Sequence, residues 1–376
     1  MQKKIARTKK RAARRIRETQ LFAKALRSPR HPILVHLVPT RRCNLSCRYC
    51  NEFDSSSLPV STGTLFTRID QLAELGTTMI HLSGGEPMLH PHLESLIERI
   101  RSKGMIAGLL TNGILLSQKR IEGLNSAGLD HLQISIDNVE PDDVSKKSLK
   151  VLDKKLRLLA EYAEFDVNIN SVLGNYLEQP ADALKIAERS HELGLSSTVG
   201  IIHDEQGQLR PLGAEQRKVY EQIKALQKPL FRAASHNRFQ ENMVRGLPTD
   251  WNCHAGSRYL YICEDGLVHY CSQQRGTPGI PLADYKVDDL DREYRREKDC
   301  TRYCTVSCVH RTAWLDTLRE DPYEALKQFF PGDEENWTTA SLPPVVRGLT
   351  WLFLPDQRTR KPSLFSKLAL RLLGVR

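Results

Sequence analysis

The stretch that decides the fold runs from Ile33 to Cys50 and reads ILVHLVPTRRCNLSCRYC. Its first part, up to Val38, is rich in apolar and β-branched residues and predicts a short strand. Directly after that strand, Cys43, Cys47 and Cys50 form a C-x3-C-x2-C pattern. Three thiolates on one tight loop can bind three irons of a cubane and leave the fourth iron open. A zinc site is the alternative, but it needs a fourth ligand such as histidine, and the loop contains none.

A second motif, Ser83-Gly84-Gly85-Glu86-Pro87, follows the second predicted strand. Because the two glycines lack side chains, we expect the backbone here to approach a ligand closely. The carboxylate of Glu86 can accept a hydrogen bond from an ammonium group. A simple strand-to-helix turn would explain the two glycines equally well, so this motif alone is weak evidence of a site.

Outward from these motifs, strand and helix patterns alternate through residue 227. The predicted strands are 33–38, 79–82, 106–110, 132–136, 167–172 and 198–202, and the predicted helices are 62–75, 92–103, 118–127, 147–163, 181–193 and 215–227. Such alternation requires parallel strands with right-handed crossovers. Six units fall short of the eight that close a barrel, so we expect an α/β fold with an open, partial (β/α)6 TIM-like barrel. Ligands then sit at the carboxyl ends of the strands, where both motifs lie.

Together the two motifs resemble those of the radical S-adenosylmethionine (SAM) superfamily, and the resemblance covers about residues 31–230. It implies that Cys43, Cys47 and Cys50 hold a [4Fe-4S] cluster whose open iron is chelated by the amino and carboxylate groups of SAM. Members of this family split SAM with one electron, supplied by a donor such as flavodoxin or ferredoxin. The resulting 5′-deoxyadenosyl radical removes a hydrogen atom from the substrate, while the protein supplies orientation.

The resemblance also implies a set of SAM-contacting residues at the ends of successive strands. This set consists of Tyr49, Gly84, Gly85, Glu86, Pro87, Asn112, Ser135, Asp137 and Asn170. Alternatives remain for three of them: Ser135 as an ordinary strand residue, Asp137 as a cap of the next segment, and Ser171 in place of Asn170. The G-x-I-x-G-x-x-E pattern of some relatives is missing from this sequence, so the adenine contacts stay unassigned.

A second group of cysteines follows in residues 251–310. The stretch from Cys253 to Cys271 predicts a hairpin with arms at 260–262 and 267–269 and a turn at Asp265-Gly266. It resembles the SPASM and twitch extensions of radical SAM enzymes, which implies one auxiliary [4Fe-4S] cluster. The implied ligands are Cys253, Cys271 and two of Cys300, Cys304 and Cys308.

The ligand set of this small cysteine-rich hairpin and helical extension stays open, because the C-x2-C-x5-C-x3-C pattern of full SPASM domains is missing. Cys263 is a buried thiol or a further ligand. The spare cysteine of the later three is a structural thiol or a hydrogen-atom donor. A zinc-stabilised hairpin is the alternative for the whole region.

Basic residues gather at the two ends of the 376-residue chain, which carries a net charge of +10. We expect five regions: a basic helical arm at 1–30, the radical SAM core at 31–230, a linker at 231–250, the auxiliary cluster region at 251–310, and a helical region with a basic amphipathic tail at 311–376. The arm either touches phosphates of lipid or nucleic acid or is solvated. An apolar tail face at 364–373 beside Lys367 and Arg371 predicts an interfacial helix on anionic lipid, or a helix docked on the enzyme itself.

The cellular location follows from composition. No apolar run approaches the roughly 20 residues that span a bilayer, and no apolar segment suited to a signal peptide follows the charged N-terminus. The nine cysteines are clustered and odd in number, which favours metal ligands over disulfides. We therefore expect a cytoplasmic protein, with peripheral contact at the membrane surface through its tail as an option.

Four functions remain open from the sequence. The first is a radical SAM enzyme that matures a peptide, and the second is one that modifies a lipid at the membrane. The third, suggested only by charge, is a nucleic-acid-modifying enzyme. The fourth is a non-catalytic iron–sulfur or zinc binding module with the same fold, against which the intact Gly84-Gly85-Glu86 turn argues.

Overall fold

The strands that the sequence predicts form the centre of the molecule. The computed structural model describes residues 2–50, 52–143, 145–174, 179–202, 209–228, 232, 235–330 and 337–353. Its central strands are β1 (Leu34–Thr40), β2 (Met79–Gly84), β3 (Ile106–Thr111), β4 (His131–Ser135), β5 (Asp166–Leu173) and β6 (Ser196–Ile201). All five neighbouring pairs are parallel. The parallel sheet expected from the alternating pattern is therefore confirmed.

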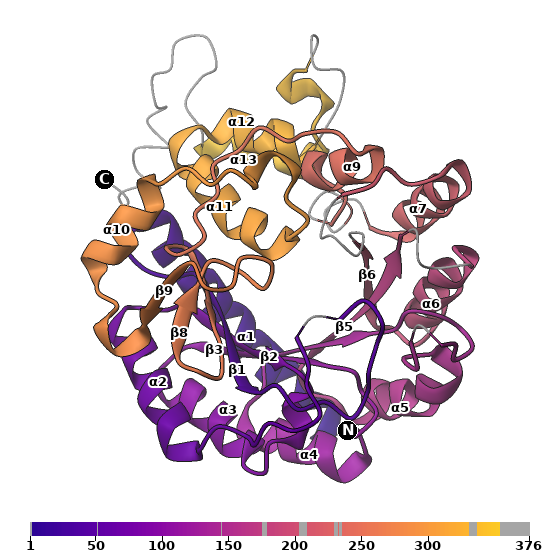
Figure 1. Ribbon diagram of the computed structural model, residues 1–376. Helices are drawn as coiled ribbons and strands as arrows, with labels where there is room; N and C mark the ends of the chain where they lie inside the picture. The colour runs from indigo at the N-terminus through magenta and orange to yellow at the C-terminus, as the bar shows by residue number, and fades with distance from the viewer. Residues whose placement is uncertain are drawn as a thin grey trace.

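Helices cover the outside of the arc that these strands describe (Figure 1). They are α2 (Thr62–Glu74), α3 (Leu93–Ser102), α4 (Gln118–Ala127), α5 (Leu149–Tyr162), α6 (Ala181–Glu192) and α7 (Ala214–Leu226). Local signals set their ends: the side chains of Ser61 and Ser117 accept hydrogen bonds from backbone N–H groups in the first turns of α2 and α4. Gly128 ends α4 with φ at 84°, a conformation that glycine adopts without steric cost. The partial (β/α)6 barrel is confirmed.

The two faces of the sheet differ in chemistry. Toward the helices the strands present a continuous apolar core that includes Val35, Leu37, Ile80, Leu82, Leu109, Leu132, Ile134 and Ile169. The alternate residues line the inner face of the arc, among them His36, His81, Gln133, Asn168 and Asn170. Because side chains alternate along a strand, one hydrophobic face anchors the helices while the other leaves polar groups available for a ligand.

The predicted hairpin is present, but it belongs to the central sheet and is not a separate extension. Its arms β7 (Tyr259–Ile262) and β8 (Leu267–His269) pair antiparallel, and β9 (Pro278–Pro281) continues the ladder. β7 also pairs parallel with β1, which gives one nine-stranded sheet in the order β6-β5-β4-β3-β2-β1-β7-β8-β9. Within the described residues no pairing joins β6 to β9, so the barrel is open.

The segment expected to be a linker contains a helix, α9 (Arg238–Arg245). Asn237 caps its start, and Gly246 ends it in the left-handed region. Phe239, Met243 and Val244 are buried in a second apolar cluster together with residues of β6 and α7. This burial explains the helix, because a solvated linker would leave the three side chains in water.

Helices α11, α12 and α13 lie in the opening of the arc (Figure 1), and the remaining elements are short. The elements not yet given are η1 (Pro87–Leu89), η2 (Leu282–Asp284), α10 (Val287–Arg295), η3 (Thr301–Tyr303), α11 (Ser307–Glu320), α12 (Pro322–Phe329), η4 (Thr339–Ser341) and α13 (Pro344–Phe353). The apolar tail face expected at 364–373 lies outside the described residues. In the part of the chain that is described, no helix has both the length and the apolar character needed to cross a bilayer.

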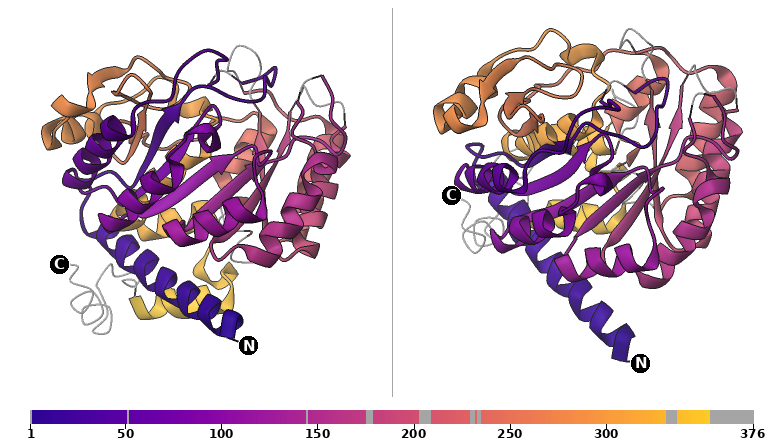
Figure 2. Two further views of the ribbon diagram at one scale, coloured as in Figure 1. Left: turned by 90° about the horizontal axis from the view of Figure 1, so that it is seen from below. Right: turned by 60° about the horizontal axis from the view of Figure 1, so that its bottom comes forward.

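The basic N-terminal helix α1 (Gln2–Arg27) runs beneath the strands, as both views in Figure 2 show. Arg14 is buried and pairs with Asp166, and Arg17 lies 2.7 Å from the carboxylate of Asp130. The ammonium group of Lys24 donates to the carbonyl oxygen of Gly76 over 2.9 Å. Arg14 and Arg17 neutralise acids at the floor of the barrel, and Lys24 binds a backbone carbonyl there. The expectation of a solvated or phosphate-binding arm is therefore wrong for these three side chains and stays a prediction for the rest of the arm.

Candidate functional site

The loop that carries the first three cysteines is tied to the ends of β1 and β2. The backbone N–H of Gly85 donates to the carbonyl of Thr40 over 3.1 Å, and that of Glu86 donates to the carbonyl of Arg42 over 2.9 Å. On the other side of the loop, Asp54 N–H donates to the carbonyl of Arg41 over 2.9 Å. The cysteine loop therefore has a fixed base at the carboxyl end of the sheet.

The two glycines of the second motif make room for that base. Gly84 has φ at 112°, and a Cβ atom placed on it would lie 2.5 Å from Cγ1 of Val38. A Cβ atom on Gly85 would lie 2.2 Å from the carbonyl oxygen of Arg41. We expected these glycines to allow close approach to a ligand; in the structure they allow close approach to the backbone that carries the cysteines. Their direct contact with a ligand stays a prediction.

Glu86 is buried with its carboxylate held by three donors. Oε1 accepts hydrogen bonds from Met88 N–H (3.0 Å) and the Thr111 hydroxyl (2.7 Å), and Oε2 accepts one from Asn112 N–H (2.8 Å). Burial raises the pKa of Glu86 above its usual value, while these donors act in the opposite direction. Oε2 accepts a single one of these bonds, so it keeps capacity for a cationic ligand group.

Asn112, expected near SAM, lies against the cysteine loop. Its amide Nδ2 donates to Oδ1 of Asn44 over 2.8 Å and to Sγ of Cys43 over 3.8 Å. Its own Oδ1 accepts from the backbone N–H of Ile114 over 3.0 Å, which fixes the orientation of the amide. A donor held in this way stabilises negative charge on a sulfur ligand.

The three thiols of the loop are half-buried or buried. Sγ of Cys47 lies 3.6 Å from the hydroxyl of Ser145, a residue that sequence reasoning did not select. Leu45 N–H donates to Sγ of Cys43 over 3.4 Å. Burial raises the pKa values of Cys43 and Cys50 above the usual value for a thiol. A metal centre that binds the thiolate forms would offset this penalty.

The spacing of these thiols argues against a single zinc ion. Two groups of three ligand atoms in the described part of the chain lie within 4.8 Å of one another, and neither of them contains Cys43, Cys47 or Cys50. A tetrahedral zinc ion with bonds of about 2.3 Å would hold its sulfur ligands about 3.8 Å apart. Iron–sulfur clusters are held by cysteine thiolates, so three thiols on one loop supply the ligand type that such a cluster takes.

Tyr49 and Asp137 contact each other and share a buried lysine, Lys147, that sequence reasoning missed. The Tyr49 hydroxyl donates to Oδ2 of Asp137 over 2.5 Å, and Nζ of Lys147 donates to the Tyr49 oxygen and lies 3.1 Å from Oδ2 of Asp137. Burial acts to lower the pKa of Lys147, but the charges of Asp137, Tyr49 and Cys47 raise it above its usual value. The signal available in the sequence was a lysine shortly after the fourth strand.

The residues expected on β4 and β5 separate into two faces. Ser135 and Asn170 are partners in the ladder and both are partly exposed. Oδ1 of Asn170 accepts a hydrogen bond from the Thr198 hydroxyl over 2.9 Å. Ser171 is buried on the opposite face, next to Asn170 in the chain, so it is Asn170 that borders the inner side of the arc. Contact of Ser135 or Asn170 with SAM stays a prediction.

The second group of cysteines converges on one place. Burial raises the pKa of Cys271 to about 12, and the neighbouring thiols of Cys253 and Cys308 add to the effect. Burial likewise raises the pKa of Cys304, with contributions from Cys253, Cys271 and Cys300. Thiols influence one another in this way only at short range, so these five cysteines form one cluster of thiols. Which four of them bind a metal centre stays a prediction.

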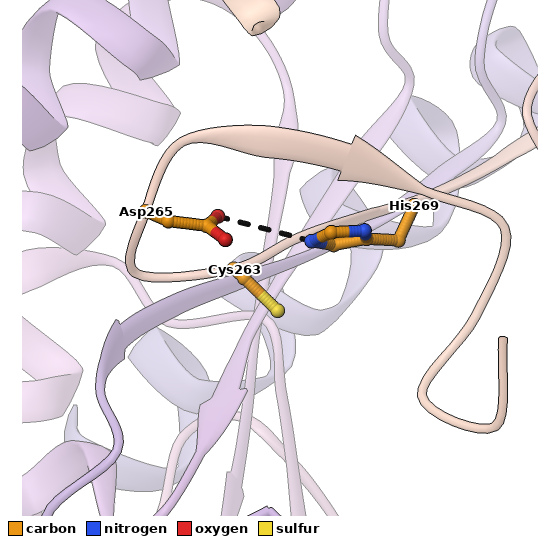
Figure 3. A group of neighbouring side chains, drawn as sticks. All are labelled: Cys263, Asp265 and His269. Carbon is orange, nitrogen blue, oxygen red and sulfur yellow. Dashed lines mark ion pairs between the residues drawn. The ribbon is translucent and has the colours of Figure 1, made fainter. Parts of the chain in front are cut away.

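Cys263 belongs to a different group, with Asp265 and His269 (Figure 3). Asp265 Oδ1 lies 3.8 Å from Nε2 of His269. The three side chains could suit a cation, but Nδ1 of His269 accepts a hydrogen bond from the N–H of Gly276 over 2.9 Å. A neutral imidazole that accepts at Nδ1 carries its proton on Nε2, the atom that faces Cys263 and Asp265, and a protonated nitrogen cannot bind a metal. This geometry favours a structural thiol at Cys263.

Comparison with known proteins places this site in a family. Residues 37–203 match the family model described as "Radical SAM superfamily". The chain is 40% identical over 117 residues to a PqqA peptide cyclase of Gluconobacter oxydans, covering 30% of this chain and 32% of that protein. It is 41% identical over 104 residues to a PqqA peptide cyclase of Methylocella silvestris, covering 27% and 28%. The match thus spans about a third or less of these relatives' length.

A solved structure shows the same fold. The crystal structure of SuiB from Streptococcus suis superposes with a TM-score of 0.53 at 13% sequence identity, covering 72% of this chain and 67% of SuiB. At this identity the likeness concerns the fold alone. The family match over β1 to β6, together with the geometry of the cysteine loop, leads to one conclusion: residues 37–203 form a radical SAM domain.

Proposed function

We propose that the chain is a radical SAM enzyme that acts on a peptide. The observation that carries the proposal is the arrangement at the ends of β1 to β3. There Cys43, Cys47 and Cys50 lie on one loop, with the oriented carboxylate of Glu86 and the amide of Asn112 beside them. When bound, a [4Fe-4S] cluster and SAM would supply the reductive cleavage of SAM that starts radical chemistry.

The residues of the chain have separate tasks in this proposal. The three thiolates hold the cluster, and Glu86 Oε2 accepts a hydrogen bond from the SAM ammonium group. Asn112 donates to the sulfur of Cys43 and so keeps that ligand oriented. Ser135 and Asn170 border the place where the ribose and methionyl groups would lie.

The test of this activity is release of 5′-deoxyadenosine from SAM under anaerobic conditions with dithionite as the electron source. The wild-type protein, reconstituted with iron and sulfide, is expected to release it, and Cys47→Ala is expected to release none. Cys263→Ala is the matched control, since it removes a thiol outside both cysteine groups and should keep the activity. A reconstituted wild-type sample with neither turnover nor a spectral response to SAM would overturn the proposal.

A peptide is the substrate class that the relatives favour, because the similar curated proteins carry the name PqqA peptide cyclase. Part of the N-terminal charge that suggested nucleic acid or lipid is used inside the molecule, because Arg14, Arg17 and Lys24 bind groups at the floor of the barrel. Incubation with short peptides encoded beside the gene, followed by mass spectrometry, tests this. A peptide that loses hydrogen atoms only in the presence of SAM and reductant supports the proposal, and modification of RNA or lipid alone would contradict it.

We further propose that the second cysteine group holds one auxiliary [4Fe-4S] cluster. Cys253 and Cys271 are two of its ligands, since Cys253 acts on Cys271 and both act on Cys304. Two of Cys300, Cys304 and Cys308 supply the other ligands. Iron analysis should find about eight irons per chain in the wild type and about four in Cys253→Ala. A low-potential flavodoxin or ferredoxin is the proposed electron donor.

A further inference from the structure

Both cysteine groups contain the same local arrangement of a tyrosine, a cysteine and a buried lysine. At the first site Tyr49 directly precedes Cys50, and Nζ of Lys147 lies 5.1 Å from the centre of the Tyr49 ring. At the second site Tyr270 directly precedes Cys271, and Nζ of Lys298 lies 5.1 Å from the centre of the Tyr270 ring. The two lysines come from unrelated parts of the chain, a loop after β4 and a loop after α10.

Each lysine places its positive charge beside the thiols of its own site. Lys147 is 12% exposed, and its charge acts on Cys47 and on Cys50. Lys298 is 9% exposed, and its charge acts on Cys253 and Cys300. A charge in a poorly solvated position is screened weakly, so its effect on nearby groups is larger than at the surface.

The partners of the two ammonium groups differ. Lys147 is held by the carboxylate of Asp137 and the hydroxyl of Tyr49. Lys298 donates to two backbone carbonyls, those of Glu293 and Arg296. The negative charge of Asp137 thus opposes part of the effect of Lys147 on the first site. Oδ1 of Asp137 is buried without a hydrogen-bond partner. Removal of Lys147 should therefore make the electrostatic potential at the first site more negative, and removal of Asp137 should make it more positive.

We propose that Lys147 and Lys298 each raise the reduction potential of the iron–sulfur cluster in their own site, a role that rests on the function proposed above. A cubane with thiolate ligands gains negative charge when it is reduced, and its potential depends on net charge and burial. A fixed ammonium group stabilises the reduced form more than the oxidised form. The step is a one-electron reduction by a low-potential donor, in which no bond is made or broken.

The experiment is a redox titration of the reconstituted full-length protein, followed by electron paramagnetic resonance. The signal of the first cluster is identified by its change when SAM is added, and the midpoints are measured without SAM. Lys147→Met should make the reduction equilibrium of that cluster at least tenfold less favourable, a negative shift of about 59 mV for one electron. It should leave the midpoint of the second cluster in place.

Lys298→Met serves as the matched variant, because it should shift the second cluster and spare the first. Lys147→Arg and Lys298→Arg keep the charge and should stay near the wild-type midpoints. Lys150→Met removes an exposed lysine three residues from Lys147 and should shift neither midpoint. Unchanged midpoints in both Lys→Met variants, or equal shifts of both clusters in each variant, would overturn the inference.

If Lys147→Met fails to assemble the first cluster, a second variant still tests the inference. Asp137→Asn keeps the ammonium group and removes the opposing anion, so it should shift the first midpoint to a more positive value. A negative shift or no shift there contradicts the inference. Failure of the proposed function looks different, because the wild-type protein itself would then lack iron, sulfide and a SAM-responsive signal.

Discussion

The guanidinium of Arg258 donates to the carboxylate of Asp316 over 2.9 Å, and both side chains are at most 1% exposed. Arg258 also donates to the backbone carbonyls of Ala25, Ser28 and His31. One side chain therefore joins the end of α1, the start of the hairpin and α11. It holds the second cysteine region against the radical SAM domain.

Replacing Arg258 should loosen this junction. Arg258→Met leaves the buried Asp316 carboxylate and three carbonyl groups with fewer donors, and breaking a buried pair in this way costs about 3–5 kcal/mol of unfolding free energy. Urea unfolding followed by circular dichroism measures the change. Arg30→Met, which breaks an exposed pair with Asp291, is the control and should have little effect. Equal stability of Arg258→Met and wild type would contradict this account.

Gly85→Ala should prevent assembly of the first site. The new Cβ atom would overlap the carbonyl oxygens of Arg41 and Arg42, at 2.2 and 2.4 Å, so the base of the cysteine loop must move. We expect reconstituted samples to lose about half of their iron, that of the first cluster. Gly63→Ala is the matched control, because nothing lies within 4 Å of its Cβ position. Full iron content with normal SAM cleavage in Gly85→Ala would show that the loop tolerates displacement.

Glu86→Gln should weaken SAM binding and leave the cluster in place. The substitution removes the negative charge that faces the SAM ammonium group, and a hydrogen bond to a charged group contributes about 1.5–3 kcal/mol, or roughly 10- to 100-fold in affinity. Titration of the SAM-induced spectral change gives the dissociation constant, and iron content serves as the check on assembly. Glu94→Gln on α3 removes a carboxylate outside the site and should keep wild-type affinity.

His236 should make the protein less stable as the pH falls. It is 2% exposed, and burial, with the charges of Lys224, Arg232 and Arg311, lowers its pKa to about 4. In the unfolded chain His236 binds a proton near pH 6.5, whereas in the folded chain it binds one only near pH 4. Stability from this residue is therefore present above pH 6.5 and is lost between pH 6.5 and 4, at about 1.4 kcal/mol per pH unit.

The measurement for His236 is urea unfolding at several pH values for wild type and His236→Phe. The aromatic replacement can keep the contact with Tyr220, whose ring centre lies 4.9 Å away. As the pH is lowered from 6.5 to 4, the free energy of unfolding of His236→Phe should fall less steeply than that of the wild type. His92→Gln, at an exposed position, should follow the wild-type curve. Parallel curves for wild type and His236→Phe would refute the assignment.

Local patterns in the sequence were enough to predict the six parallel strands, the helices between them and the two motifs that carry the family resemblance. Turn residues such as Gly128, caps such as Ser61 and the spacing of Cys43, Cys47 and Cys50 are read within a few residues, so they need no tertiary information. The open α/β barrel follows from the alternation of these elements. The same approach missed α9, because a short helix in a polar segment depends on the cluster into which Phe239 and Met243 pack.

The sequence by itself determined that three thiols and a Gly-Gly-Glu turn stand at the ends of neighbouring parallel strands, since motif order and strand direction are properties of the chain. Only the tertiary structure decided which distant groups complete the site. Lys147 reaches Tyr49 from 98 positions away, the hairpin pairs with β1, and Arg14 and Arg17 of α1 pair with acids beneath the barrel. Such contacts depend on strand register and side-chain packing, which bring together residues that no local periodicity relates.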